Sequence, residues 1–574
     1  MRAIETTPVA RTRQVVIAAL ILLALGSIGA VQAALSGASF MNDLEIVQPP
    51  LARIEPAIHE AGTPRLARRV YLVIIDGLRA DKSYELPFLD SLRRSGLDLE
   101  AQSHYPTWSR PNYVSILAGV PPSASGVRTN HHSTPVTLDT LMDRAHAAHL
   151  SVATATDYAV LPQLFLRPAT SVVATIDPDA LEQLDIDTMQ EPLAKAIVDA
   201  PDATLVSPFD DARYVPWPGG FSAAGMALVA GGKADLVVLL VSSVDIAGHQ
   251  YGADSAKYRD AAESADRALA RVLGRVDLTQ DAIVVVADHG HTGKGGHGGV
   301  EPEVLTVPLI LAGAGVERTG TADDARLIDI APTVAALLGV AAPGHGLGRT
   351  LTHVLALDAG ARARLEAADT ARLVTTERVV AIADARASDE LLEHRALRVG
   401  AVALCTALAV VLALVMHRSG ALRFHIRVLL TAVPAFFVVY YGLIGTFGQR
   451  FSPSLVPAQG HLAAQLAKYG LVGMVFQVAV SLWALRNQGN LARRLAAANG
   501  IAWTGLVLAM LPAGLLWAFF PAPYLALPGP VWLVVIPAVK VAVACAAITT
   551  ALTLALEVIV FAARAWHREH PHLT

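Results

Sequence analysis

The stretch that decides the fold is residues 282–299, which read AIVVVADHGHTGKGGHGG. An apolar, largely β-branched run ends in Asp288 and His289, and a glycine-rich loop then carries His297. A short apolar run bounded in this way is typical of a buried β-strand. We therefore expect a core strand that delivers carboxylate and imidazole groups at its carboxyl end.

Two other stretches share this design. Residues 70–75 (VYLVII) lead into Asp76, and residues 236–241 (LVVLLV) lead to Asp245 and, four residues later, to His249. A loop around Ser109 offers a hydroxyl group in place of a carboxylate. In a parallel α/β sheet, ligands bind at the carboxyl ends of the strands. The sequence therefore predicts that these side chains meet there.

Between residues 70 and 347, strand-like apolar runs alternate with alanine-rich amphipathic stretches. This alternation predicts an α/β domain with a mainly parallel sheet flanked by helices. Residues 36–69 contain prolines and mixed charges, which predicts a linker. Residues 348–397 are rich in Ala, Arg, Glu and Asp, which predicts a helical connector.

The composition also predicts a membrane part, because 53% of the 574 residues are hydrophobic and only 16% are charged. Residues 1–35 predict an amino-terminal transmembrane anchor, although the small residues around Ala33 also permit a cleaved signal peptide. Further apolar segments at 398–416, 428–447, 467–485, 500–520 and 531–561 predict an all-α, five-helix transmembrane domain over residues 398–566.

The distribution of positive charge predicts the topology. Arginines crowd the loops near residues 418–427 and 486–494, whereas the alternate loops, 448–466 and 521–530, are poor in positive charge. By the positive-inside rule, both termini are cytoplasmic and residues 36–397 are extracytoplasmic. The alanine-rich composition suggests a bacterial chain, so we expect a multi-pass protein of the inner (plasma) membrane with a periplasmic domain.

Other features limit the function. A net charge of −4 gives no basic surface for nucleic acid. Cys405 and Cys545 both lie in apolar segments, so no disulfide framework is expected. Lys540, inside the last apolar segment, is interpreted either as an interfacial residue or as a ligand for a lipid phosphate. Few charges other than Lys540 and Glu557 lie in the spans, which argues against a solute pathway.

The polar groups at the predicted strand ends form one candidate metal site. Its members are Asp76, Ser109, Asp245, His249, Asp288, His289 and His297. Carboxylates and imidazoles suit zinc, or manganese if oxygen ligands dominate. Seven ligands exceed what one tetrahedral ion needs, so we expect two divalent metal ions. Ser109 is the candidate nucleophile beside them.

In their order along the chain, these residues resemble the two-metal site of the alkaline phosphatase superfamily, in its phosphodiesterase and transferase branches. The resemblance implies an alkaline-phosphatase-like domain and a hydroxyl nucleophile that becomes phosphorylated. It also divides the ligands into two sets. Asp76, Ser109, Asp288 and His289 would surround one ion. Asp245, His249 and His297 would surround the other.

The stretches around Asp76-Gly77-Leu78-Arg79 and Pro106-Thr107-Trp108-Ser109 are similar to those of glycosylphosphatidylinositol ethanolamine phosphate transferases. This resemblance implies transfer of a phosphoethanolamine-like group from a phospholipid donor to an alcohol on a lipid or glycan acceptor. Asn112 instead resembles an asparagine of nucleotide pyrophosphatase/phosphodiesterases, where it helps to bind a phosphate oxygen. Hydrolysis of a nucleotide or lipid phosphodiester is therefore the alternative reaction.

Three further expectations complete the site. Arg110 and Lys294 are predicted to neutralise phosphate charge. His291, like His131 and His132, is expected to be an ordinary loop residue outside the site. The sulfatase modification signal is absent after Ser109, so sulfate ester cleavage is disfavoured. A non-enzymatic membrane scaffold or transporter is a further alternative, although no ligand of the site is missing.

Overall fold

The computed structural model describes residues 8–46, 48–156, 158, 164–165, 170–174, 234–447, 452–455, 462–488 and 490–569. The chain divides into two compact units. The membrane unit comprises Met1–Leu44, Ala387–Ser452 and Gln459–Thr574. The second unit comprises Glu45–Arg386 and Pro453–Ala458, and we call it the catalytic unit because it contains the candidate nucleophile Ser109. Residues 175–233 of the predicted catalytic domain lie outside the described residues.

The catalytic unit is built on a seven-stranded sheet with the order β2-β7-β6-β1-β5-β3-β4. Its strands are β1 Val70–Ile75, β2 Gly96–Gln102, β3 Val152–Thr156, β4 Thr170–Ala174, β5 Leu236–Val241, β6 Ala282–Val286 and β7 Thr306–Gly313. Only β7 runs antiparallel to its neighbours. The predicted mainly parallel sheet is confirmed. Strands β1, β5 and β6 are buried along their whole length, as expected of central strands covered on both faces.

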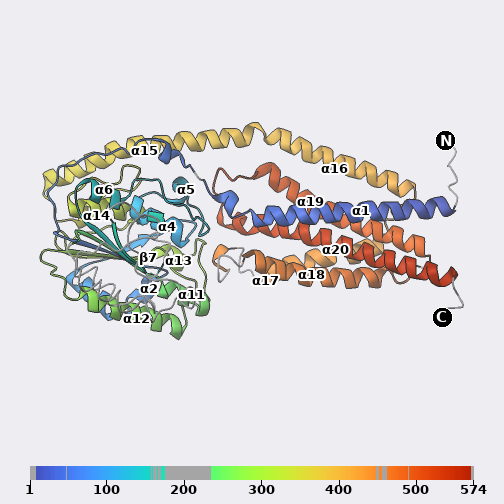
Figure 1. Ribbon diagram of the computed structural model, residues 1–574, viewed down its shortest axis with the longest axis horizontal. Helices are drawn as coiled ribbons and strands as arrows, with labels where there is room; N and C mark the ends of the chain where they lie inside the picture. The colour runs from blue at the N-terminus through green and yellow to red at the C-terminus, as the bar shows by residue number, and fades with distance from the viewer. Residues whose placement is uncertain are drawn as a thin grey trace, which may run out of the picture. The chain divides into compact units, whose positions relative to one another are not determined.

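Helices flank this sheet, with α4, α6 and α14 on one side and α11 and α12 on the other (Figure 1). The helices of the unit are α2 Ala80–Ser83, α3 Pro87–Ser95, α4 Ser109–Ala118, α5 Pro122–Ser125, α6 Leu141–Ala147, α11 Ser243–Tyr251, α12 Ala256–Leu273, α13 Pro302–Leu305, α14 Ile330–Leu338 and α15 Ala359–Glu393. The short 3₁₀ helices of this unit are η2 Pro50–Arg53, η3 Leu327–Asp329, η4 Thr352–Val354 and η6 Pro453–Leu455, and η1 Asn42–Leu44 belongs to the membrane unit. The α/β class predicted from the alternating pattern is therefore observed.

The predicted linker, residues 36–69, is largely not a linker. From Glu45 onward these residues belong to the catalytic unit. Leu51 and Ala67 are buried in its hydrophobic core. Arg68 and Arg69 both form ion pairs with the buried carboxylate of Asp281. The prolines and charges suggested an extended, solvated segment, but the few apolar residues between them anchor it to the core.

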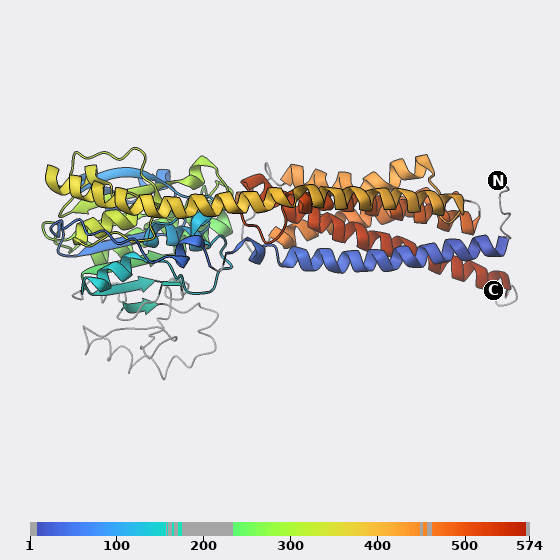
Figure 2. The same cartoon turned by 90° about the horizontal axis from the view of Figure 1, so that it is seen from above.

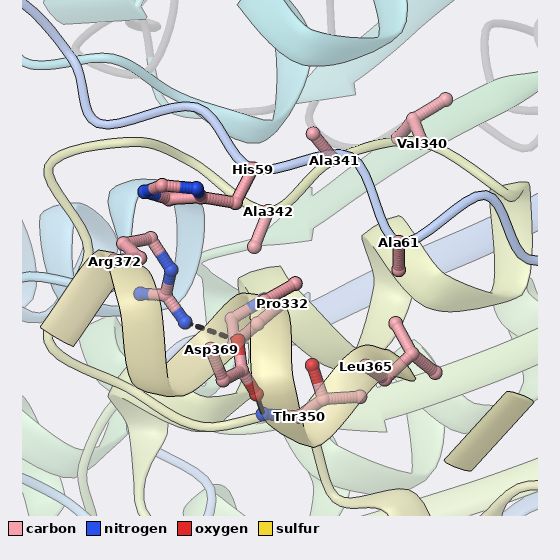
Figure 3. A pocket seen from close by; sticks show the side chains of 11 residues that line it. His59, Ala61, Pro332, Val340, Ala341, Ala342, Thr350, Leu365, Asp369 and Arg372 are labelled. Atoms are coloured by element: carbon pink, nitrogen blue, oxygen red, sulfur yellow. Dashed lines mark hydrogen bonds and ion pairs between the residues drawn. The ribbon is translucent and has the colours of Figure 1, made fainter. Parts of the chain in front are cut away.

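The predicted connector, residues 348–397, also packs against the catalytic unit through α15. Arg372 is buried and donates hydrogen bonds to the carbonyl oxygens of Gly346 and Gly348, both at 2.7 Å. Arg372 pairs with Asp369 one turn earlier, and Asp369 accepts a hydrogen bond from the amide of Thr350 (Figure 3). A buried guanidinium with these partners fixes the first half of α15, so the unit extends to Arg386.

The membrane unit consists of long apolar helices. They are α1 Pro8–Ala38, α16 Arg395–Arg418, α17 Ile426–Phe447, α18 Leu462–Leu485, α19 Leu491–Phe519 and α20 Pro530–Glu569. Within the described residues, six helices are long and apolar enough to cross a membrane. Helices α1 and α20 run side by side (Figures 1 and 2). The chain is therefore a multi-pass membrane protein, as its composition predicts.

Charged groups in this unit find partners within it. Arg494 of α19 and Glu557 of α20 form a bidentate ion pair with N–O distances of 2.5 and 2.8 Å. The ammonium group of Lys540 donates to the carbonyl oxygen of Ser36 at 2.8 Å and lies over the rings of Phe40 and Tyr524. Aromatic partners are typical of the membrane interface, so these contacts fit the interfacial interpretation of Lys540.

Candidate metal centre and nucleophile

The carboxylates of the site come from three adjacent strands, β6, β1 and β5. Asp76 follows β1 directly, and Asp288 lies two residues after β6. Asp245 lies in the first turn of α11, the helix that follows β5, and His249 lies one turn further on. Residues four apart share one face of a helix, so both side chains of α11 point the same way. The predicted convergence at the strand ends is therefore present.

The first group, which we call the nucleophile cluster, consists of Asp76, Ser109, Asp288 and His289, all buried. The Ser109 hydroxyl lies 3.2 Å from Nε2 of His289 and 3.4 Å from Oδ1 of Asp76. The same Nε2 atom lies 3.4 Å from Oδ1 of Asp76 and 3.3 Å from Oδ2 of Asp288. Four candidate ligand atoms thus meet around one point.

Ser109 is the first residue of α4, whose backbone N–H groups and dipole favour negative charge at this end. Pro111 is tolerated there because it lies in the first turn. The helix ends at Gly119, which has a φ of 69°. A serine oxygen at a helix amino terminus is well placed to bear charge or to receive a phosphoryl group.

The structure corrects the predicted role of Asn112. Its side chain is fully buried, and its amide nitrogen donates to the carbonyl oxygens of His104, Pro106 and Trp108. Its amide oxygen accepts a hydrogen bond from the backbone of His104. Asn112 therefore uses its polar atoms to hold the turn that leads into Ser109. It has no group left to bind a phosphate oxygen.

The second group, which we call the imidazole cluster, consists of Asp245, His249, His291 and His297. Nε2 of His297 lies 3.0 Å from Nε2 of His249 and 3.6 Å from Oδ1 of Asp245. Nε2 of His249 lies 3.5 Å from Oδ2 of Asp245. The rings of His289 and His297 stack with their centroids 3.7 Å apart, so the two clusters adjoin.

The hydrogen bonds of the ring nitrogens define the tautomers. Nδ1 of His297 lies 2.5 Å from the carbonyl oxygen of Thr107, and Nδ1 of His289 lies 3.1 Å from that of Gly290. A carbonyl oxygen only accepts, so both Nδ1 atoms carry the proton. The Nε2 atoms of both rings are then unprotonated and face the site. This arrangement, with a carbonyl oxygen behind the ring, is typical of metal-binding histidines.

His291 was not predicted to belong to the site, yet it lies within it and is buried. Its Nδ1 accepts a hydrogen bond from the amide of Gly296, so its Nε2 carries the proton and donates to Oδ1 of Asp245 at 2.8 Å. A Cβ atom on Gly248 would come within 2.5 Å of this ring, so α11 requires a glycine there. His291 therefore orients Asp245, and it also belongs to a group of side chains whose ligand atoms are close enough to share an ion.

The carboxylates of the two clusters have pKa values that are shifted in opposite directions. Burial raises the pKa of Asp76 well above its usual range, and the carboxylates of Asp288 and Asp245 raise it further. Burial also raises the pKa of Asp288. Burial acts on Asp245 in the same sense, but His249, His291 and His297 outweigh it and hold the pKa of Asp245 well below its usual range.

Divalent metal ions fit this donor set. Two groups of carboxylate and imidazole atoms are close enough to share an ion, namely Asp76, Asp288 and His289, and Asp245 with His289, His291 and His297. Oδ2 of Asp288 is buried and has no hydrogen-bond partner among the residues that the structure describes, although a carboxylate oxygen demands one. Burial lowers the pKa of His289 and, more strongly, that of His297, which keeps both rings neutral and able to bind a cation.

The two predicted phosphate-binding cations differ in position. The guanidinium of Arg110 donates to the carbonyl oxygen of His132, and its buried Nε has no hydrogen-bond partner in the described part of the chain. Lys294 lies exposed on the glycine-rich loop.

Tyr113 is a residue of the site that was not predicted from the sequence, and its hydroxyl group donates to Oδ2 of Asp76. Its place one turn after Ser109 on α4 was the available signal.

A further neighbour of the site comes from the segment between α17 and α18. Ser454 is buried, accepts a hydrogen bond from the amide of Gly299 at 2.8 Å, and donates to Oε2 of Glu301 at 2.5 Å. Thr107 binds the same loop, because its hydroxyl accepts from the amide of Gly298 and donates to the carbonyl oxygen of Gly299. Ser454 and Thr107 thus hold the loop that carries His297 from two directions.

Comparison with known proteins identifies the type of domain. Residues 70–296 match the family model described as type I phosphodiesterase / nucleotide pyrophosphatase. GPI ethanolamine phosphate transferase 1 of Yarrowia lipolytica is 26% identical over 336 residues, which cover 50% of this chain and 34% of that protein. The mouse protein of the same name is 25% identical over 325 residues, which cover 50% of this chain and 32% of that protein.

The match therefore spans about a third of the length of these transferases. Among solved structures, the wild-type alkaline phosphatase PafA aligns with 51% of this chain and 99% of its own, at 13% identity and a TM-score of 0.37. The resemblance found in the sequence is confirmed by the family model and the transferases. Residues 70–296 are thus similar to the type I phosphodiesterase / nucleotide pyrophosphatase family, in line with the resemblance found in the sequence.

Proposed function

We propose that this protein is a membrane-bound, metal-dependent transferase that moves a phosphoethanolamine-like group from a phospholipid to an alcohol on a lipid or glycan. The observation that carries the proposal is the position of the Ser109 hydroxyl, at the start of α4 and within 3.4 Å of both Asp76 and His289. The names of the transferases that are similar to half of this chain support the choice of transferred group.

In this proposal, Asp76, Ser109, Asp288 and His289 hold one divalent ion, and Asp245, His249 and His297 hold the other. Zinc is the expected metal because imidazole supplies so many of the ligands, and manganese is the alternative. Such ions, when bound, favour the deprotonated serine and neutralise the phosphate oxygens. His291 and Tyr113 orient the carboxylates of Asp245 and Asp76.

The reaction proceeds in two displacements at phosphorus. In the first, the Ser109 oxygen bonds to phosphorus while the bond to the diacylglycerol oxygen breaks, and that oxygen takes up the proton that leaves Ser109. In the second, the acceptor oxygen bonds to phosphorus while the bond to Ser109 breaks, and Ser109 regains a proton from the acceptor. The helix dipole of α4 stabilises the negative charge on the phosphoryl-serine intermediate.

We further propose that the catalytic unit lies on the extracytoplasmic side of the inner (plasma) membrane, with both termini in the cytoplasm. The arginine-rich loops near residues 418–427 and 486–494 support this topology. A cysteine-free variant carrying single cysteines at residue 131 or residue 487 tests it in intact cells. An impermeant thiol reagent should label the first and spare the second.

Hydrolysis of a phosphodiester is the second candidate function. The match of residues 70–296 to a phosphodiesterase and nucleotide pyrophosphatase model favours it. The commitment of Asn112 to backbone carbonyls removes the argument that the sequence offered for hydrolysis. The two functions share every residue of the site and differ only in whether water or an alcohol accepts the group.

One experiment separates them. Purified full-length protein is incubated with phosphatidylethanolamine labelled in the head group, with and without a lipid extract that supplies alcohols. Label that passes to a new lipid species, and fails to do so with Ser109→Ala, supports transfer. Label that appears only as free phosphoethanolamine supports hydrolysis. Release that is unchanged in Ser109→Ala contradicts both.

A further inference from the structure

An apolar groove lies in the wall of the membrane unit, between α16 and α19. Its volume is about 360 Å³, within the range of small-molecule binding sites. It is lined by Ala401, Val402, Cys405, Thr406, Ala409, Val507, Met510, Leu511, Gly514 and Trp517. Small residues on α16 and Gly514 on α19 leave this space, because larger side chains at these positions would fill it.

The groove is about as long as an acyl chain of one membrane leaflet. From Ala401 to Ala409 the helix rises by roughly 12 Å at 1.5 Å per residue. One leaflet contributes about half of the roughly 30 Å hydrocarbon core. Exposed leucines of α16, such as Leu404 and Leu408, border the groove and mark this helix as facing lipid. An acyl chain of one leaflet therefore matches the groove in length and in polarity.

Arginine side chains lie beyond one end of the groove, on the same face of α16 as the residues that line it. Arg395, Arg398, Val402, Cys405 and Ala409 follow at intervals of three and four residues, so they share one face of the helix. Arg398 already has hydrogen-bond acceptors within the protein, because its guanidinium donates to the carbonyl oxygens of Ala518 and Leu391.

Arg395 differs from Arg398. Its guanidinium lies over the ring of Phe519 at 5.3 Å, and its Nε is buried without a hydrogen-bond partner among the described residues. The Arg395 side chain is only half-buried, so part of it remains accessible to an anion, and phosphate is the anion that bilayers supply in quantity. The aromatic ring beneath it holds the guanidinium at the end of the groove.

We propose that this groove and Arg395 form a binding site for one glycerophospholipid, with an acyl chain between α16 and α19 and the phosphate at Arg395. The site lies wholly within the membrane unit and requires no transfer chemistry. Its occupancy is measured without turnover, so failure of this proposal and failure of the proposed transferase activity give separate results.

Native mass spectrometry of the purified full-length protein in detergent tests the proposal. The probes are phosphatidylethanolamine and a diacylglycerol with the same acyl chains. The wild-type protein should retain phosphatidylethanolamine at least tenfold more tightly than the diacylglycerol. Arg395→Gln should lose this difference, whereas Arg418→Gln, at the other end of α16, should keep it.

The groove itself is tested by filling it. Ala409→Phe places a ring in the groove and should abolish binding of both probes, whereas Leu408→Phe, at an exposed neighbouring position, should not. The proposal is overturned if Arg395→Gln retains the wild-type preference for phosphatidylethanolamine. It is also overturned if Ala409→Phe binds each probe as tightly as Leu408→Phe does. Monomer mass and melting temperature, measured on each variant, identify a misfolded variant, and Arg395→Met, which also removes the charge but keeps an apolar stem, then replaces Arg395→Gln.

Discussion

The nucleophile cluster and the imidazole cluster adjoin through the stacked rings of His289 and His297, yet their electrostatics are opposite. In the nucleophile cluster, burial and neighbouring carboxylates raise the pKa of Asp76. In the imidazole cluster, three histidines lower the pKa of Asp245 despite its burial. The first cluster therefore needs an external cation to hold its carboxylates ionised, whereas the imidazoles of the second cluster already favour the ionised form of Asp245.

This contrast predicts the largest effect at the nucleophile cluster. Ser109→Ala should lower kcat by a factor of about 10⁴ or more, because it removes the atom that attacks phosphorus. It should leave most of the bound metal in place, since the carboxylates and imidazoles remain. Asp288→Ala should lower activity as much and also remove metal. Activity assays combined with metal analysis separate the two variants, and equal metal loss in both would contradict the division of roles.

The pH dependence of metal binding tests the histidines of both clusters. An ordinary imidazole has a pKa of about 6.5, and burial lowers that of His289 and His297. Protons then compete with the cation for these rings only below the ordinary range. Metal content, measured after equilibration at a series of pH values, should stay constant from pH 8 down to about 6.5 and fall below it. Half-loss of metal at or above about pH 6.5 would show that burial does not protect these rings.

A smaller effect is expected for His291, which orients Asp245. His291→Ala should weaken metal binding at the imidazole cluster by roughly 10- to 100-fold, because an outer hydrogen bond to a metal ligand is lost. His291→Gln, which can still donate to Asp245, should recover part of this loss. His131→Ala is the matched control, since His131 is exposed. Titration with a chelator measures the affinities, and equal values for His291→Ala and His131→Ala would remove His291 from the site.

The smallest effect is expected for Ser454, which contacts the loop that carries His297 but belongs to neither cluster. Ser454→Ala removes two hydrogen bonds and should lower kcat/KM by roughly fivefold, the equivalent of about 1 kcal/mol. Ser454→Thr, which retains the hydroxyl group, should restore most of the activity. A chelator titration reports whether the loss arises from looser metal binding. An unchanged kcat/KM would mean that Thr107 alone holds this loop.

The sequence predicted those parts of the site that follow from strand position. Asp76, Asp245 and Asp288 each follow an apolar run, and parallel strands bring such residues to one edge. His291 could not be predicted, because the loop around it depends on the positive φ angles of Gly295 and Gly296, which the sequence leaves undetermined. The role predicted for Asn112 was wrong because it came from resemblance, whereas its contacts depend on how the turn at 104–108 folds back.

The limits of the domains could likewise be predicted only where a local sequence pattern marks them. The sheet and the apolar helices could be predicted, because their patterns are local. The packing of residues 45–69 could not, because it depends on a few side chains such as Leu51 that find the core only in three dimensions. The contact of Ser454 with Gly299 joins residues far apart in the chain, and no local pattern signals it.

We propose that the two clusters would hold two divalent ions and that the Ser109 oxygen would be a ligand of one of them. Anomalous diffraction from crystals of the full-length protein, recorded at the absorption edge of the bound metal, tests it most directly. Two peaks about 4 Å apart are expected, one within bonding distance of Asp76, Asp288 and Ser109 and the other of Asp245, His249 and His297. A single peak, or peaks away from these side chains, would contradict it.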